Sequence, residues 1–384
     1  MCLLELIPIL LSVFLTDPRV ERFGCTWPAL KFLPRGNVYQ QSHATLGADD
    51  FGRRYVVYSG AGTCPDPNLC GAYYQWSADG VTWTDPQFVP GSEDVGWSEP
   101  EVVGAPGGRA YIVWSGNKGL EVTWTDDLGQ TFAPSVFVDP SAPGSLTIRV
   151  EVDRGGDLHL TWGNNYNLYY ARSVHGAALS TGRSSAPQFL PAQRLWADDG
   201  RFSYNASVDV DDAGWVSIAY VATDHTVAFT RAYQGLDFPP SRMLANQTWH
   251  LQLAVSPDGP VTVVYEALVG SRSQKILSAV AMDGLNFQGP FELTHLNGGL
   301  YNNKCVRAGA NGRVYASWVE QWAGMGWESH LTYRESYDYG RSFVRRDFLA
   351  DNRQWPGGFD PSLAITPDGF RCVVEHSAQY TQCR

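Results

Sequence analysis

The chain has 384 residues, a formal net charge of −11, 17% charged residues, 13% aromatic residues and 39 glycines. Few charges combined with many aromatics and glycines are typical of a folded all-β protein and not of a disordered or helical one. The negative charge argues against a partner with a phosphate backbone, and no basic cluster contradicts it, so we expect no nucleic-acid partner.

The first hydrophobic segment, residues 3–15, is apolar enough for the core of a signal peptide. No Lys or Arg precedes it, Glu5 and Pro8 interrupt it, and it is too short to span a bilayer. We expect residues 1–16 to be a signal peptide or its remnant, or else a strand of the fold or an extended start site. Residues 17–384 are predicted to form one domain of a secreted or cell-surface monomer without a membrane span.

A glycine turn followed six residues later by an aromatic residue recurs along the chain, with a period of roughly 50 residues. The pairs are Gly52/Tyr58, Gly108/Trp114, Gly156/Trp162, Gly214/Tyr220, Gly259/Tyr265 and Gly312/Trp318, and Gly369/Glu375 is a seventh with a carboxylate in the aromatic position. The residues between each pair are mostly apolar, which predicts a strand that leaves a tight turn. A period of this length is typical of the blades of a β-propeller.

Each unit reads as four strands. The first enters the glycine turn (100–103, 207–210, 361–365), the second leaves it, the third follows (72–76, 120–124, 330–335), and the fourth ends the unit (86–89, 135–138, 345–349). The predicted fold is an all-β propeller with seven four-stranded blades, or six as the alternative.

The last unit lacks a fourth strand, and the missing strand is predicted at the N-terminus. Residues 24–34 align with residues 80–90, so the N- and C-terminal strands would close the ring within one blade.

The seven cysteines fit no zinc pattern, and we expect no metal and no cofactor. Cys25 and Cys383 would lie on neighbouring strands, and Cys64 and Cys70 flank a short loop, so each pair is a candidate disulfide. Cys305 and Cys372 lie in apolar runs and are equally well interpreted as buried thiols.

A second motif, S-x-D-x-G-x-[ST]-[WF], occurs in full at residues 125–132 and 336–343. Shorter copies lie at 77–83 and 281–287, and worn copies at 173–179 and 232–238. Its Asp and Ser/Thr side chains can hold a hairpin turn by hydrogen bonds, and its Gly supplies a positive φ. Active carboxylates rarely occur as interchangeable copies, so we interpret the motif as a structural turn rather than a catalytic or calcium site.

The chemistry is predicted at the starts of the first strands, which line the central channel of a propeller. Counting back nine from each turn glycine gives only polar residues: His43, Glu99, Thr147, Asn205, His250, Asn303 and Asp360. Counting back seven gives Thr45, Glu101, Arg149, Ser207, Gln252, Cys305 and Ser362, whereas the positions between are mostly apolar. This period of two indicates strands with one polar face.

Roughly one aromatic residue per blade lies just upstream of these positions. Polar groups ringed by aromatics suit a sugar, although a water-filled channel with packing aromatics is the alternative. The predicted substrate-binding residues are His43, Trp97, Arg149, Tyr204, Asn205, Trp249, His250, Tyr301 and Asn303.

The candidate catalytic carboxylates are Glu99, Glu101 and Asp360. Glycoside hydrolysis needs two such groups, one as the acid and one as the nucleophile or base. The alternative for the first two is a salt bridge between one of them and Arg149. Residues at the ends of second strands also reach toward this mouth in the predicted fold, namely Glu266, Glu320, Glu375 and His376. His43 and His250 are candidate bases for a lyase.

Through residues 125–132 and 336–343 and the shorter copies, the chain resembles the Asp-box (BNR-repeat) propellers of the sialidase superfamily. That resemblance implies boxes on turns away from the active face. It also implies one of several functions: sialidase, another glycoside hydrolase, a polysaccharide lyase or a non-catalytic binding module. The chain departs from sialidases because it has no early F-R-I-P-like motif, and only Arg149 and Arg307 fall on first strands.

The predicted partner is therefore a carbohydrate, and the predicted function is that of a sialidase-like glycoside hydrolase. A lectin-like glycan-binding propeller, a protein-interaction scaffold and a polysaccharide lyase are the alternatives. The polar ring differs from blade to blade, which favours one asymmetric site over a repeated binding site.

Overall fold

The computed structural model of the chain describes residues 31–34, 42–60, 71–93, 95, 99–164, 167–174, 186–195, 202–222, 224–246, 248–268, 274–294, 299–322, 328–352, 361–374 and 379–383. These residues form strands and turns, contain no helix, and belong to seven antiparallel sheets. It follows that none of them lies in a helix able to cross a membrane. The predicted signal segment lies outside the described residues.

The strands of each sheet follow one another along the chain. The first two sheets contain β2 (Ser42–Ala48), β3 (Arg54–Ser59), β4 (Ala72–Ser77) and β5 (Gln87–Phe88), and then β6 (Glu101–Ala105), β7 (Arg109–Gly116), β8 (Gly119–Thr125) and β9 (Val136–Asp139). The third contains β10 (Leu146–Val152), β11 (Leu158–Asn164), β12 (Asn167–Val174), β13 (Gln188–Phe189) and β14 (Gln193–Leu195), where β13 and β14 both pair with β12. The fourth contains β15 (Phe202–Val210), β16 (Trp215–Ala222), β17 (Val227–Tyr233) and β18 (Arg242–Ala245).

The remaining sheets repeat this order. They contain β19 (Thr248–Val255), β20 (Val261–Leu268), β21 (Gln274–Ala281) and β22 (Phe287–Glu292), and then β23 (Gly299–Ala308), β24 (Val314–Trp322), β25 (Glu328–Ser336) and β26 (Val344–Asn352). The last consists of β27 (Ser362–Ile365), β28 (Arg371–Val374), β29 (Gln379–Cys383) and β1 (Lys31–Phe32).

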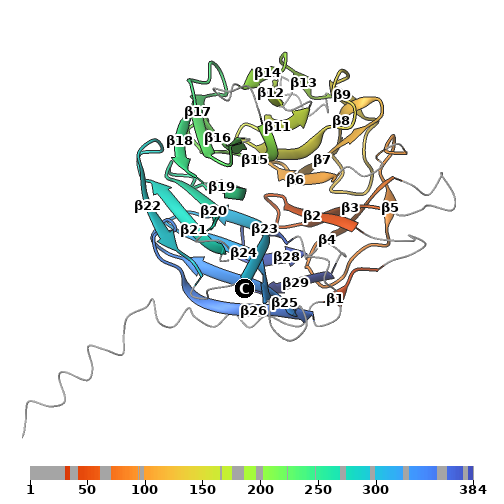
Figure 1. Cartoon of the computed structure of the whole chain (residues 1–384). Coiled ribbons are helices and arrows are strands. Elements are labelled where there is room, and N and C mark those ends of the chain that lie inside the picture. Colours follow the sequence, from red (N-terminus) through yellow and green to blue (C-terminus); the bar gives the residue numbers. More distant parts are fainter. Residues whose placement is uncertain are drawn as a thin grey trace, which may run out of the picture.

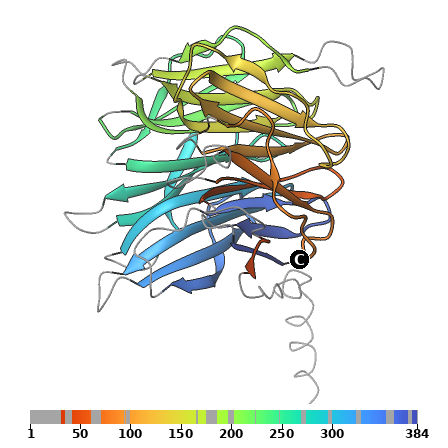
Figure 2. The ribbon, with the colours of Figure 1, turned by 90° about the vertical axis from the view of Figure 1, so that its right-hand side faces the viewer.

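The sheets are arranged in a ring as a propeller (Figure 1), and a cavity lies between their first strands. The first strands β2, β6, β10, β15, β19, β23 and β27, called the inner strands below, contact one another in that order, and β27 contacts β2. In the last sheet Lys31 of β1 pairs with Tyr380 of β29, so both ends of the chain complete one sheet, as predicted. Figure 2 shows the strands from the side, running between the two faces of the ring.

The recurring aromatic residues explain how the sheets stack. Trp114, Trp162 and Trp318 are completely buried, and Tyr58 and Tyr220 are at most 1% exposed. Each lies on a second strand and belongs to a core formed with a neighbouring sheet. Truncation of one such aromatic to Ala typically costs about 3–5 kcal/mol, so these residues define the repeat physically.

The second motif forms hairpin turns, as predicted. Asp338 Oδ1 accepts hydrogen bonds from the Ser342 backbone N–H (2.8 Å) and the Ser336 hydroxyl (2.7 Å). Gly340 has φ +88°, and a Cβ there would approach Thr262 Cγ2 of the preceding sheet to 2.7 Å. These turns follow the third strands and lie at the face toward which the inner strands run. We call it the box face; it is opposite the end where the inner strands begin, which we call the mouth.

Cys305 and Cys372 are buried thiols, in agreement with one of the two interpretations of these cysteines. Both candidate disulfides involve Cys25, Cys64 or Cys70, which lie outside the described residues.

Candidate functional site

The inner strands are irregular where they begin, at the mouth. The register of β2, β10, β15, β19 and β23 against the neighbouring second strand shifts once, within their first residues. Such bulges re-aim side chains and often occur beside active sites. His43 and Thr147 lie in these bulges with φ of +53° and +54°. Non-glycine residues in this region of φ cost about 1–3 kcal/mol each, so these two bulges hold a strained backbone.

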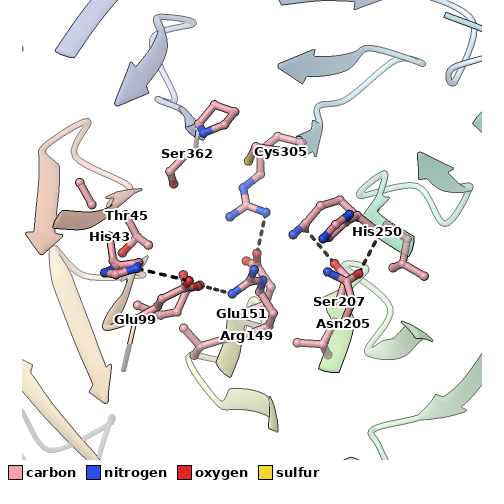
Figure 3. Close-up of a pocket in the computed structure, with 18 residues that line it drawn as sticks. His43, Thr45, Glu99, Arg149, Glu151, Asn205, Ser207, His250, Cys305 and Ser362 are labelled. Carbon is pink, nitrogen blue, oxygen red and sulfur yellow. Dashed lines mark hydrogen bonds and ion pairs between the residues drawn. The ribbon is translucent and has the colours of Figure 1, made fainter. Parts of the chain in front are cut away.

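A polar cavity of about 150 Å³ opens between the inner strands (Figure 3). All seven sheets contribute to its polar lining, through β2, β10, β15, β19, β23, β27 and the β6 region. The polar lining residues are His43, Thr45, Glu99, Glu101, Arg149, Glu151, Asn205, Ser207, His250, Gln252, Cys305, Arg307 and Ser362. The lining therefore draws on every inner strand, and no two sheets contribute the same set.

Two partly buried ion pairs cross the cavity between sheets. Arg149 Nη1 of β10 lies 2.6 Å from Glu101 Oε1 of β6, and Arg307 Nη1 of β23 lies 3.1 Å from Glu151 Oε1 of β10. Burial raises the pKa of Glu101 to about 7, although Arg149 opposes the shift. Burial also raises the pKa of Glu151, against the attraction of Arg307. A carboxyl group that titrates near neutrality in a cavity is suited to proton transfer.

Two imidazole–carboxylate pairs also lie at the cavity, and their imidazoles, His43 and His250, lie on opposite sides of it (Figure 3). His43 Nε2 is 3.9 Å from Glu99 Oε1, and its Nδ1 is 3.5 Å from the Ser59 hydroxyl. His250 Nδ1 is 3.4 Å from Glu266 Oε2, which belongs to β20 and is only 2% exposed.

Other polar residues of the inner strands connect one strand to the next. Backbone N–H groups of β19 donate to three side chains of β15: Leu251 to Asn205 Oδ1 (2.9 Å), Leu253 to Ser207 Oγ (3.1 Å) and Val255 to Asp209 Oδ2 (2.7 Å). The Leu46 N–H likewise donates to Ser362 Oγ, and Thr45 donates to the Pro100 carbonyl. Much of the polar ring is thus structural, because it satisfies inner-strand backbone groups that would otherwise be unpaired.

The structure brings six predicted site residues together in the cavity lining: His43, Glu99, Glu101, Arg149, Asn205 and His250. Glu99 precedes β6, which begins at Glu101, and the salt bridge between Glu101 and Arg149 was the alternative considered for that carboxylate. Trp97 and Asp360 lie outside the described residues, and so do the side chains of Tyr204, Trp249, Tyr301 and Asn303.

Three charged residues of the channel are absent from the predicted site: Glu151, Asp209 and Arg307. They occupy the next step of the same pattern, five residues before the turn glycines Gly156, Gly214 and Gly312. At the corresponding positions, the other four inner strands carry Gly47, Val103, Ala254 and Ala364. Within the described part of the chain, no cluster of His, Cys, Asp and Glu is arranged to hold a metal ion.

No model of a known protein family matches the chain, and no curated protein matches it. Among solved structures, the BP39L lectin from Burkholderia pseudomallei is similar with a TM-score of 0.60 and 14% identity, over 89% of this chain and 98% of that chain. A polysaccharide lyase of the PL25 family, an ulvan lyase bound to -[GlcA(1-4)Rha3S]-, is similar with a TM-score of 0.56 and 12% identity, over 94% of this chain and 95% of that chain. A protein of unknown function from Dyadobacter fermentans is similar with a TM-score of 0.52 and 11% identity, over 94% of this chain and 98% of that chain. At these identities the similarity establishes the propeller fold alone.

Proposed function

We propose that the protein is a seven-bladed carbohydrate-active propeller, related to the Asp-box propellers, that hydrolyses a glycosidic bond at the mouth with Glu101 as the proton donor. The observation that carries the proposal is a partly buried carboxyl group, with a pKa of about 7, in a polar cavity. The seven sheets and the fold shared with a lectin and a polysaccharide lyase support it.

The lining suits a hydroxyl-rich ligand because it offers both donors and acceptors. Arg149 and Arg307 each use only Nη1 in their ion pairs and in their hydrogen bonds to the backbone carbonyls of Ile148 and Val306, respectively. Glu99 has 45% of its side chain exposed and can accept from sugar hydroxyls. The cavity volume of about 150 Å³ equals the volume that about five water molecules occupy in liquid water. It therefore has space for part of a glycan, and the rest would lie outside the mouth.

The chemistry follows from the protonation state of Glu101. Near pH 7 about half of the Glu101 side chains carry a proton, which can pass to the oxygen of the leaving sugar as the glycosidic bond breaks. The carboxylate that remains lies 2.6 Å from Arg149, which stabilises the negative charge formed in the transition state.

A screen of chromogenic glycosides and natural oligosaccharides with the wild-type chain tests this proposal. We expect hydrolysis of at least one class, and loss of that hydrolysis in Glu101→Gln, which cannot donate a proton but still accepts from Arg149. Hydrolysis that persists in Glu101→Gln would remove the assignment of the acid.

A non-catalytic glycan-binding role is the second candidate. It is favoured by the hydrogen bonds that tie Asn205 and Ser207 to β19, because a polar ring that locks strands together needs no catalytic purpose. Binding on a glycan array without turnover of any bound glycan would favour this role. A new carbon–carbon double bond in the product, detected by its ultraviolet absorbance, would instead indicate a lyase.

A further inference from the structure

His250 and Glu266 form a pair that has no role in the proton transfer proposed for Glu101. Glu266 lies on the second strand β20, is 2% exposed, and does not line the cavity, whereas His250 lies on the inner strand β19, lines the cavity and is 40% exposed. A buried carboxylate is costly unless it is paired, and the imidazole lies between this carboxylate and the cavity.

The geometry fixes which ring nitrogen faces the ligand. An ionised carboxylate only accepts hydrogen bonds, so the contact of Glu266 Oε2 with Nδ1 at 3.4 Å favours the tautomer with its proton on Nδ1. No hydrogen bond links Nε2 to any described residue. The Nε2 lone pair is then available to accept a proton inside the cavity. The register shift of β19 between Thr248 and Leu251 lies at this position and aims the ring.

His43 does not offer the same arrangement. Both of its nitrogens have neighbours in the protein, Glu99 at 3.9 Å and Ser59 at 3.5 Å, and its side chain is 21% exposed. It also lies on the same side of the cavity as Glu99, whereas His250 lies across from them (Figure 3).

Hydrolysis by direct attack of water requires an acid and a base on opposite sides of the bond. Glu99 and Glu101 are two residues apart and lie on one side, so they do not provide such a pair. We propose that His250 is the general base that activates the attacking water and that Glu266 is its positioning residue. This inference rests on the proposed function of the mouth.

The step balances without a further reactant. The water oxygen bonds to the anomeric carbon while His250 Nε2 takes the water proton, and the bond from the anomeric carbon to the leaving oxygen breaks. Glu101 gives its proton to that oxygen, and proton exchange with solvent then restores both groups. A single displacement of this kind inverts the configuration of the anomeric carbon.

The first test needs no substrate. Nitrogen-15 NMR of the full chain, with labelled histidine, reports which nitrogen of His250 carries the proton. We expect Nδ1 to be protonated in the wild type and in Glu266→Gln, whose amide oxygen still accepts, and a tautomer mixture in Glu266→Leu. A proton on Nε2 in the wild type, or a tautomer unchanged in Glu266→Leu, would overturn the positioning role.

The second test uses the glycoside that the wild-type chain hydrolyses in the screen. His250→Ala is expected to lower kcat about 100-fold or more with little change in KM, Glu266→Gln less, and proton NMR of the first product should show inversion. His43→Ala serves as the matched histidine control, with a smaller loss. Unchanged kcat in His250→Ala, or a product of retained configuration, would overturn the base while leaving Glu101 as the acid. No turnover by the wild type would overturn the proposed function and this inference together, whatever the NMR result.

Discussion

The mouth and the box face both carry acidic residues, but the pKa values of these residues are shifted in opposite directions. On the box face, the backbone N–H groups of Thr82 and Val81 lower the pKa of Asp79 to about 2, and those of Asn286 and Leu285 do the same for Asp283. At the mouth, burial raises the pKa of Glu101 to about 7. Deeper in the channel, burial also raises the pKa of Asp209.

The difference separates structural carboxylates from candidate reactive ones. A carboxylate that accepts several N–H groups is held ionised and has no tendency to exchange a proton near pH 7. Such turns recur from sheet to sheet because each holds the same kind of hairpin after a third strand. The carboxylates of the mouth are held in a costly state by burial and differ among the sheets, which is expected of a single asymmetric site.

The largest expected effect is on catalysis. Glu101→Gln should lower hydrolysis of the best glycoside about 100- to 10,000-fold, because general acid catalysis contributes that much. Asp338→Ala, on the box face, should leave kcat within about twofold and is the matched control. Initial-rate kinetics on both variants decide the matter. Equal losses in the two variants would remove the distinction between the faces.

The next effect concerns the ion pair of Arg307 and Glu151. Arg307→Met leaves the partly buried Glu151 carboxylate without its cation, and we expect the free energy of unfolding to fall by about 1–3 kcal/mol. Urea denaturation measures the change. The double variant Arg307→Met/Glu151→Leu should recover most of the loss, because it also removes the unpaired carboxylate. Equal stabilities of the single and double variants would show that the unpaired carboxylate is not the cause of the loss.

Stability should also depend on pH with opposite signs at the two faces. Glu101 titrates at 4.5 in the unfolded chain and at about 7 when folded, so the native state binds more protons between these values. Its contribution to the free energy of unfolding therefore falls as the pH rises from about 4.5 to 7, by about 2 kcal/mol. Asp79 contributes stability that is present above pH 4 and is lost as the pH falls toward 2.

Glu101→Gln isolates the first of these two contributions. In urea titrations at several pH values, the variant should lack the decline between pH 4.5 and 7 that the wild type shows. A wild-type profile that rises over this window, or a variant with an unchanged profile, would contradict the raised pKa.

The smallest expected effect is that of a single turn. Asp338→Ala removes the acceptor of the Ser336 and Ser342 hydrogen bonds and should lower the free energy of unfolding by about 1 kcal/mol. Differential scanning calorimetry would detect the corresponding decrease in Tm. A loss several times larger would mean that the box turn holds neighbouring sheets together more strongly than its own hydrogen bonds indicate.

The fold was largely predictable because each repeat is marked by residues that lie close together in the sequence. The glycine turns and the buried aromatics such as Trp114 and Trp162 mark the second strands, and the alignment of residues 24–34 with 80–90 predicted the pairing of β1 with β29. The turn role of Asp338 was equally accessible because the hydrogen bonds stay within a few residues.

The site was only partly predictable because its interactions cross sheets. Counting from the turn glycines found Glu101 and Arg149, but only the three-dimensional arrangement shows that they meet at 2.6 Å. The bulges and the positive φ of His43 could not be predicted from the alternation of polar and apolar residues along the strands. Glu151 and Arg307 lie one step further along the predicted pattern, and their pairing depends on the closure of the ring.

The most direct test of the account is the position of a bound glycan. A crystal of the Glu101→Gln variant, soaked with the oligosaccharide that the wild type hydrolyses or binds most tightly in the screen, would show it. We predict density for a sugar ring at the mouth, between Glu101 and His250. Density on the box face or between outer strands, with an empty mouth, would contradict the central claim that the starts of the inner strands form the functional site.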